Sequence, residues 1–162
     1  MALAAVLMSA SCAKEDPAKP VDYSAPAKQA TIKGKLLMND NPTMSQPKYT
    51  AKAGITVIAT VPYSELNSGS SSGAFSASTT TDSKGEFTLQ VPATQAGVNV
   101  SFAVNDVEGS KTVNSAGGTG TETQQGKWSF GIPSATVKSG QSKILDAAFG
   151  SFTQIKSVGD EV

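Results

Sequence analysis

Apolar and polar residues alternate along most of this chain, which is the pattern of half-buried β-strands. The alternation begins near Ala30 and recurs in segments separated by stretches rich in Gly, Ser, Asn and Pro. In each segment every second residue is apolar, so one face should contact a core and the other solvent. The segments are ATIKGKLL (30–37), AGITVIATV (53–61), GEFTLQVP (85–92), GVNVSFAVND (97–106), KWSFGI (127–132) and KILDAAFG (143–150).

The phase of the alternation also predicts which side chains form the core. The residues expected to point inward are Ile55, Val57, Ala59, Val61, Phe87, Leu89, Val91, Val98, Val100, Phe102, Val104, Trp128, Phe130, Ile132, Leu145, Ala147 and Phe149. The turn TDSKGEF carries Asp82 and Gly85 where a tight hairpin needs a side-chain acceptor and a positive φ. The count and spacing predict an all-β fold, a single antiparallel, Ig-like β-sandwich of about seven strands over residues 30–155.

A different pattern precedes this predicted domain. Residues 1–11 are apolar and then small, are too short to span a bilayer, and end at Cys12 as a signal peptide would. They resemble a bacterial lipoprotein signal, and the resemblance implies that the thiol of Cys12 carries a covalent lipid. The usual positively charged beginning is missing, which leaves open a start upstream of Met1. The alternative is a small buried cysteine in an ordinary N-terminal segment.

The residues after the cysteine resemble an export signal. Lys14, Glu15 and Asp16 match the lysine-then-acids pattern of many Bacteroidetes lipoproteins, which implies transfer to the outer face of the outer membrane. The alternative is that they only solvate a tether, which would leave the domain in the periplasm. Residues 12–29 contain three prolines and no apolar periodicity, so we expect a disordered, extended tether, and we expect residues 156–162 to form a tail. The tether could hold the domain about 50 Å from the lipid.

Several of the predicted strands together resemble a known module. The runs ATIKGKLL, AGITVIATV, TTTDSKGEFTLQVPA, GVNVSFAV and VKSGQSKILDAAF are similar to the transthyretin-like sandwich of carboxypeptidase regulatory domains and CnaB-type modules. The resemblance covers residues 30 to about 150 and includes Gly34 in the first strand and the SGQ turn before the last. It implies a fold and little chemistry, because such modules serve as stalks, adhesins, plugs and accessory domains.

The composition argues against most catalytic chemistry. The chain has no histidine, which removes the commonest general base, and its single cysteine excludes a zinc site made of cysteines. Its formal net charge is zero, without long runs of one sign, so nucleic acid is not an expected partner. We therefore expect neither an enzyme nor a bound cofactor, apart from the lipid on Cys12.

The domain contains two candidate sites, a calcium site and an isopeptide bond, and each has a purely structural alternative. Asn39, Asp40 and Asn41 offer oxygen ligands for calcium, but the spacing of an EF-hand is absent, and a polar turn is the favoured interpretation, so no metal is expected. CnaB-type modules sometimes form an isopeptide bond, and the resemblance implies Lys33 or Lys35 with Asp146 as partners. Both lysines alternate with the core face, and no middle strand supplies a catalytic acid, which argues against the bond.

Binding is the expected activity. Residues 62–80 and 114–127 should be long mobile loops, and Tyr63, Phe75 or Trp128 could form a stacking surface for sugar or peptide. Trp128 alternates with Phe130 and Ile132, so a core position is favoured for it. We expect a lipid-anchored outer-membrane protein, exposed at the cell surface, that acts as a non-catalytic binding or scaffolding module for a protein or glycan partner. The alternative is a structural subunit of a fimbria, or an adhesin.

Overall fold

The computed structural model describes residues 28–46, 48–66 and 72–155. Cys12, the proposed export signal, most of the tether and the tail lie outside them. The elements of the described residues are β1 (Gln29–Leu37), β2 (Thr56–Pro62), α1 (Tyr63–Leu66), β3 (Ala74–Thr80), β4 (Glu86–Pro92), β5 (Val98–Val104), β6 (Val107–Asn114), β7 (Thr121–Ser129), β8 (Ala135–Val137), β9 (Ser142–Ile144), β10 (Ala148–Phe149) and β11 (Ser151–Gln154).

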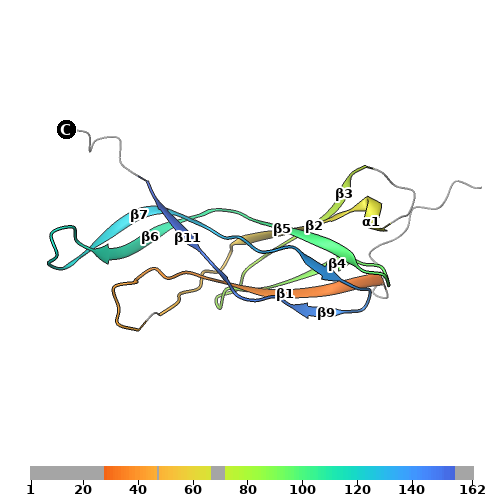
Figure 1. Cartoon of the computed structure of the whole chain (residues 1–162), viewed down its shortest axis with the longest axis horizontal. Coiled ribbons are helices and arrows are strands. Elements are labelled where there is room, and N and C mark those ends of the chain that lie inside the picture. Colours follow the sequence, from red (N-terminus) through yellow and green to blue (C-terminus); the bar gives the residue numbers. More distant parts are fainter. Residues whose placement is uncertain (1–27, 47, 67–71, 156–162) are drawn as a thin grey trace, which may run out of the picture.

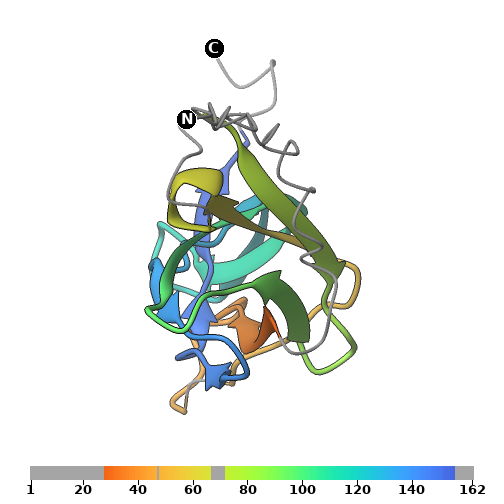
Figure 2. The ribbon, with the colours of Figure 1, turned by 90° about the vertical axis from the view of Figure 1, so that its right-hand side faces the viewer.

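The fold is an all-β sandwich. One sheet has β1 at its centre, with β4 on one side and β9 and β10 on the other, and the second sheet has the order β3-β2-β5-β8. Buried side chains of both sheets form one continuous core between the two layers. Figure 2 views the ribbon along the long axis of the molecule. This architecture confirms the fold class that the alternation predicts.

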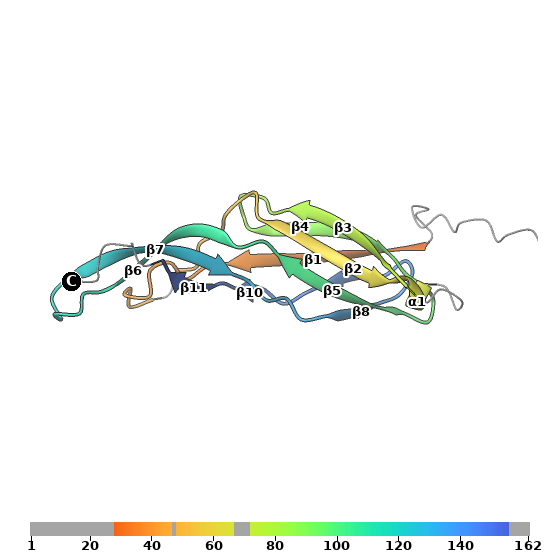
Figure 3. The same cartoon turned by 90° about the horizontal axis from the view of Figure 1, so that it is seen from above.

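A third sheet extends the sandwich. β5 runs on into β6 through Asn105 and Asp106, and β7 runs back towards β8, so these four strands form one long bent hairpin whose outer half is β6–β7. β11 pairs with β7 in this outer half. Figures 1 and 3 show that the β6–β7 turn lies at one end of an elongated molecule, and that α1 and the start of β1 lie at the other end.

Most of the predicted core is confirmed. Every predicted inward residue of β2 and β4 is buried, and so are Val98, Val100, Trp128 and Phe130, while Phe102, Val104 and Ile132 are half-buried against the same cluster. The prediction holds because successive side chains of a strand point to opposite faces. A strand with one face on a core therefore has an apolar residue at every second position.

In the last predicted strand, residues 143–150, the predicted inward and outward positions are partly wrong. Leu145 and Ala147 are half-buried, but Phe149 is 54% exposed and Ala148 is buried instead. The register explains the error: Ile144 pairs with Lys33 and Phe149 with Leu37, so five steps along β9–β10 match four along β1. One extra residue in a strand moves every later side chain to the opposite face.

Three other expectations need correction. The sandwich is not purely antiparallel, because β9 and β10 run parallel to β1 after the chain passes from the second sheet to the first. Residues 62–80 are not one loop, since they contain α1 and β3, and the expected loop at 114–127 reduces to a turn over residues 115–120. The described residues form more than the expected seven strands, because small polar side chains concealed β3 and β6.

Aromatic rings cover glycines on neighbouring strands at several points. Gly34 pairs with Phe87 across β1 and β4, and a Cβ at Gly34 would lie 2.4 Å from Cζ of that ring. In the β6–β7 outer half, a Cβ at Gly126 would lie 2.6 Å from Cζ of Phe152. The absence of a side chain at these positions leaves room for each ring beside the neighbouring backbone.

Candidate functional site

The outer face of the first sheet carries a strip of outward-pointing side chains, of which Ile144 and Phe149 are large, apolar and exposed. Lys33, Lys35 and Leu37 of β1 point away from the core, and their register partners Ile144 and Phe149 point the same way. Ile144 is 79% exposed. Lys35 is not isolated on this face, because its Nζ lies 3.7 Å from Oε1 of Glu86.

The end of this strip is an aromatic pair. Phe149 packs against Tyr49, with ring centroids 4.9 Å apart and an interplanar angle of 52°, and Tyr49 is itself 47% exposed. The bridge between Met38 and Thr50 holds the segment of Tyr49 beside the end of β1, through backbone N–H to O hydrogen bonds of 2.8 Å in both directions. Two adjacent rings that remain half exposed form a platform for a sugar face or an apolar side chain of a partner.

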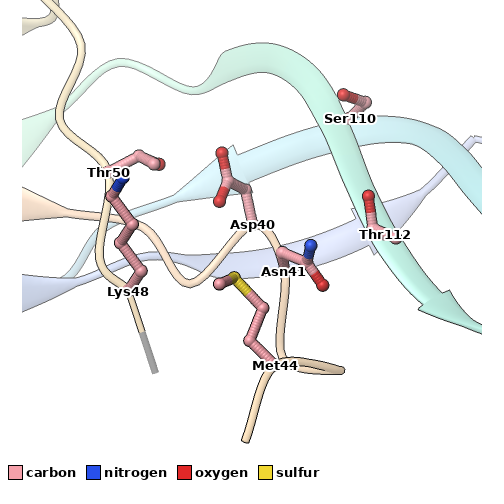
Figure 4. A pocket seen from close by; sticks show the side chains of 7 residues that line it. All are labelled: Asp40, Asn41, Met44, Lys48, Thr50, Ser110 and Thr112. Carbon is pink, nitrogen blue, oxygen red and sulfur yellow. The ribbon is translucent and has the colours of Figure 1, made fainter. Parts of the chain in front are cut away.

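A cavity lies beside the same segment. It has a volume of about 290 Å³ and lies between residues 40–50 and β6, lined by Asp40, Asn41, Met44, Lys48, Thr50, Ser110 and Thr112. Its two walls are joined, because the N–H of Thr112 donates a 2.7 Å hydrogen bond to the carbonyl oxygen of Asp40. In the view of Figure 4, Lys48 and Thr50 lie on one side of Asp40, and Ser110 and Thr112 lie on the other.

The cavity and the aromatic pair lie on opposite sides of the same stretch of chain. Lys48 and Thr50 line the cavity, and Tyr49 between them contacts Phe149. This is the alternation of an extended segment, in which successive side chains point in opposite directions. One short segment thus contributes to two distinct surfaces at the same end of the molecule.

The aromatic residues predicted as a stacking surface lie in two separate places. Trp128 is only 2% exposed and packs on Phe152 with ring centroids 5.1 Å apart, so it belongs to the core and offers no stacking surface. Tyr63 begins α1 and Phe75 belongs to β3, both half-buried and at the end of the molecule where β1 starts. The structure therefore brings Tyr63 and Phe75 to one end of the sandwich and leaves Trp128 in the core elsewhere.

The lysine and aspartate of the predicted isopeptide bond are placed unfavourably. Lys33 and Asp146 are both exposed, and Lys35 is half-buried beside Glu86. An isopeptide bond needs a lysine that burial has desolvated, and Lys33 is exposed to solvent. The described residues lack that setting.

The segment at 39–41 forms the polar turn that the sequence favours. Oδ1 of Asn41 accepts hydrogen bonds from both the N–H and the hydroxyl of Thr43, at 3.3 and 2.5 Å. Oδ1 of Asn39 is buried, and no described residue donates to it. Within residues 28–46, 48–66 and 72–155 no group of three or more acidic or cysteine side chains gathers as metal ligands would.

Sequence reasoning missed Tyr49, Met44 and the outward orientation of Phe149. Tyr49 and Met44 lie in a segment rich in Pro and polar residues without periodicity, so only the presence of large apolar side chains in a loop hinted at exposure. Phe149 could not be assigned correctly, because its face depends on the extra residue between β9 and β10.

The described part of the chain has no helix of sufficient length and apolarity to cross a bilayer. The chain matches no profile of a known protein family, and no curated protein sequence is significantly similar to it. The geometry of its own residues is therefore what a functional proposal has to rest on.

Proposed function

We propose that this chain is a lipid-anchored, non-catalytic binding module of the outer bacterial surface, which contacts a protein or glycan partner through the end of the sandwich that carries Tyr49 and Phe149. The exposed aromatic pair is the observation that carries the proposal. Singly exposed apolar residues are ordinary, but two contacting aromatic rings on an open sheet face are typical of interaction surfaces.

The position of the pair suits an anchored protein. The proposed tether enters the fold at Gln29, and β1 then runs its full nine residues, roughly 25 Å, to Leu37 beside Phe149. The outer half of the long hairpin, β6–β7, extends still further in the same direction. If Cys12 holds the lipid, the aromatic pair and the cavity beside it lie at the end remote from the membrane. The transthyretin-like resemblance of the strands is compatible with this role and adds no chemistry.

The proposal is tested on intact native cells. Treatment with a membrane-impermeant crosslinker, followed by purification of the chain and mass spectrometry, should recover a specific partner, which Phe149→Ala should abolish. Ile155→Ala is the matched control, because Ile155 is about as exposed as Phe149, at 50% against 54%, and lies beside β7, outside the strip that carries the aromatic pair. Capture that survives Phe149→Ala would reject the aromatic pair as the contact surface. A chain that takes up no reagent while the outer membrane is intact would reject surface exposure.

A second candidate, a fimbrial subunit, is favoured by one observation. β3 is an edge strand of seven residues, AFSASTT, without a charge or a proline to prevent pairing with another chain. Every second residue of β3 forms its backbone hydrogen bonds with β2. The backbone N–H and C=O groups of the others, Ala74, Ser76, Ser78 and Thr80, therefore point away from β2 at the open edge of the sheet. Filaments or ladders of the purified chain that disappear with Ser78→Lys would support this function, whereas a strictly monomeric chain would exclude it.

A further inference from the structure

From the cavity beside the aromatic pair we infer a carbohydrate subsite: the cavity lined by Asp40, Lys48, Ser110 and Thr112 binds one sugar ring of a neutral glycan. The inference rests on the proposed function in one respect, since it takes the end remote from the tether as the end that meets ligands. It concerns a different surface from the aromatic pair, so the two can fail separately.

Backbone hydrogen bonds join the walls of the cavity, while four of its polar side chains have no partner among the described residues. Hydrogen bonds between backbone atoms hold Asp40 to Thr112 and Met38 to Thr50. The amide oxygen of Asn41 is occupied by Thr43. In contrast, within the described residues no hydrogen bond or ion pair engages the carboxylate of Asp40, the ammonium of Lys48 or the hydroxyls of Ser110 and Thr112.

The cavity combines three kinds of hydrogen-bonding group. A carboxylate only accepts hydrogen bonds, an ammonium only donates them, and a hydroxyl does both. A sugar hydroxyl both donates and accepts, so adjacent hydroxyls of one ring can satisfy all three kinds of group at once. The thioether side chain of Met44, which also lines the cavity, supplies an apolar contact for the C–H face of the ring.

The charges in the cavity favour a neutral ligand. Asp40 and Lys48 bring one negative and one positive charge to the same cavity. The two charges cancel, so the cavity as a whole attracts neither an anion such as phosphate or a uronate nor a cation such as a polyamine. A hydroxyl of a neutral sugar can donate a hydrogen bond to Asp40, and another can accept one from Lys48.

The size of the cavity matches a single ring. A volume of about 290 Å³ is at the small end of the range of small-molecule sites. It admits one sugar ring, and the remaining residues of a glycan would extend into solvent. A ligand of about a dozen heavy atoms in such a site binds weakly, with a Kd in roughly the millimolar range.

The test uses the full chain with Cys12→Ser, so that it can be purified without lipid, and ligand-observed NMR with methyl glycosides of neutral hexoses and N-acetylhexosamines. We expect at least one neutral glycoside to bind. The double variant Ser110→Ala, Thr112→Val should weaken that binding by about tenfold or more. Thr112 keeps its backbone hydrogen bond to Asp40 in this variant, and unchanged fluorescence of Trp128 shows that the fold is intact.

A control variant separates binding in the cavity from binding elsewhere on the surface. Asp106→Asn changes an exposed acid outside the cavity and should not alter glycoside binding. Binding that Ser110→Ala, Thr112→Val leaves unchanged would overturn the inference. So would binding of glycine or glucuronate in place of every neutral glycoside, or no binding of any probe. Glycoside binding in a chain whose cellular partner does not depend on Phe149 would support the subsite and reject the aromatic surface.

Discussion

Gly34 is a position where one added methyl group should measurably destabilise the sandwich. It is buried on β1 and is the cross-strand partner of Phe87 on β4. A Cβ at Gly34 would lie 2.4 Å from Cζ and 2.7 Å from Cε1 of Phe87. Because non-bonded carbon atoms pack at about 3.5 to 4.0 Å, the ring would have to move by roughly 1 Å within a filled core.

The expected magnitude follows from two opposing effects. Overpacking a core by a methylene or methyl group costs about 1 to 3 kcal/mol. Replacing Gly by Ala also restricts the unfolded chain, which stabilises the fold by about 0.4 to 1 kcal/mol. Because the contact is as short as 2.4 Å, the overpacking cost should lie in the upper half of its range, so Gly34→Ala should lower the free energy of unfolding by about 1 to 2.6 kcal/mol. In a Phe87→Leu background the same change should cost at least about 1 kcal/mol less, because the clashing ring atoms are gone.

The assay is urea unfolding of the full chain, followed by the fluorescence of Trp128, which is the only tryptophan and is buried. Gly131→Ala is the control, since a Cβ at that position would have no neighbour within 4 Å, and its effect should stay within about 0.5 kcal/mol. A Gly34→Ala chain as stable as the Gly131→Ala chain would refute the predicted clash. Effects of Gly34→Ala and Phe87→Leu that add within about 0.5 kcal/mol would refute it as well.

Three further predictions concern the turn between β3 and β4 and the outer sheet face, and the same unfolding assay checks them all. Thr81→Val should lower the free energy of unfolding by about 2 to 3 kcal/mol, because the hydroxyl of Thr81 donates a 2.6 Å hydrogen bond to the backbone oxygen of Lys52 and accepts a 3.0 Å one from the N–H of Ile55. Thr80→Val, at an exposed position, is the control and should be near neutral. Gly85→Ala should cost about 2 kcal/mol or more, because φ is +74° and a Cβ would lie 2.3 Å from a backbone oxygen; an effect under about 0.5 kcal/mol would contradict this. Glu86→Gln should cost less than about 0.5 kcal/mol, because its ion pair with Lys35 is solvent-exposed, and a larger loss would show a role beyond that pair.

The sandwich could be predicted from sequence where burial is one-sided. In the four core strands β1, β2, β4 and β5 the inward positions are apolar or glycine and most of them are large, and burial follows that phase. β3 and β6 escaped prediction because their inward positions include Ala, Thr, Gly and Lys in place of large apolar residues, which leaves almost no period-two signal. Their pairing is decided by neighbouring strands, and a single sequence does not record that contact.

The candidate site could not be predicted, for a related reason. Tyr49 and Phe149 are 100 positions apart in the numbering, and their contact depends on the Met38–Thr50 bridge and on the extra residue in β9–β10. A one-residue change of register decides whether Phe149 is core or surface. Asp40 was visible as a polar residue in a turn, but its neighbours in the cavity, Ser110 and Thr112, come from β6, an element that sequence periodicity did not reveal.

The most direct test of the proposed binding role compares the two ends of the molecule. A photoreactive phenylalanine derivative would replace either Tyr49, at the end remote from the tether, or Tyr63, at the end where β1 starts, in the chain expressed in its native cells. We predict a specific covalent adduct with a cell-surface or extracellular partner from position 49, and none from position 63. An adduct formed only from position 63 would contradict the claim that this protein binds through its aromatic, membrane-remote end.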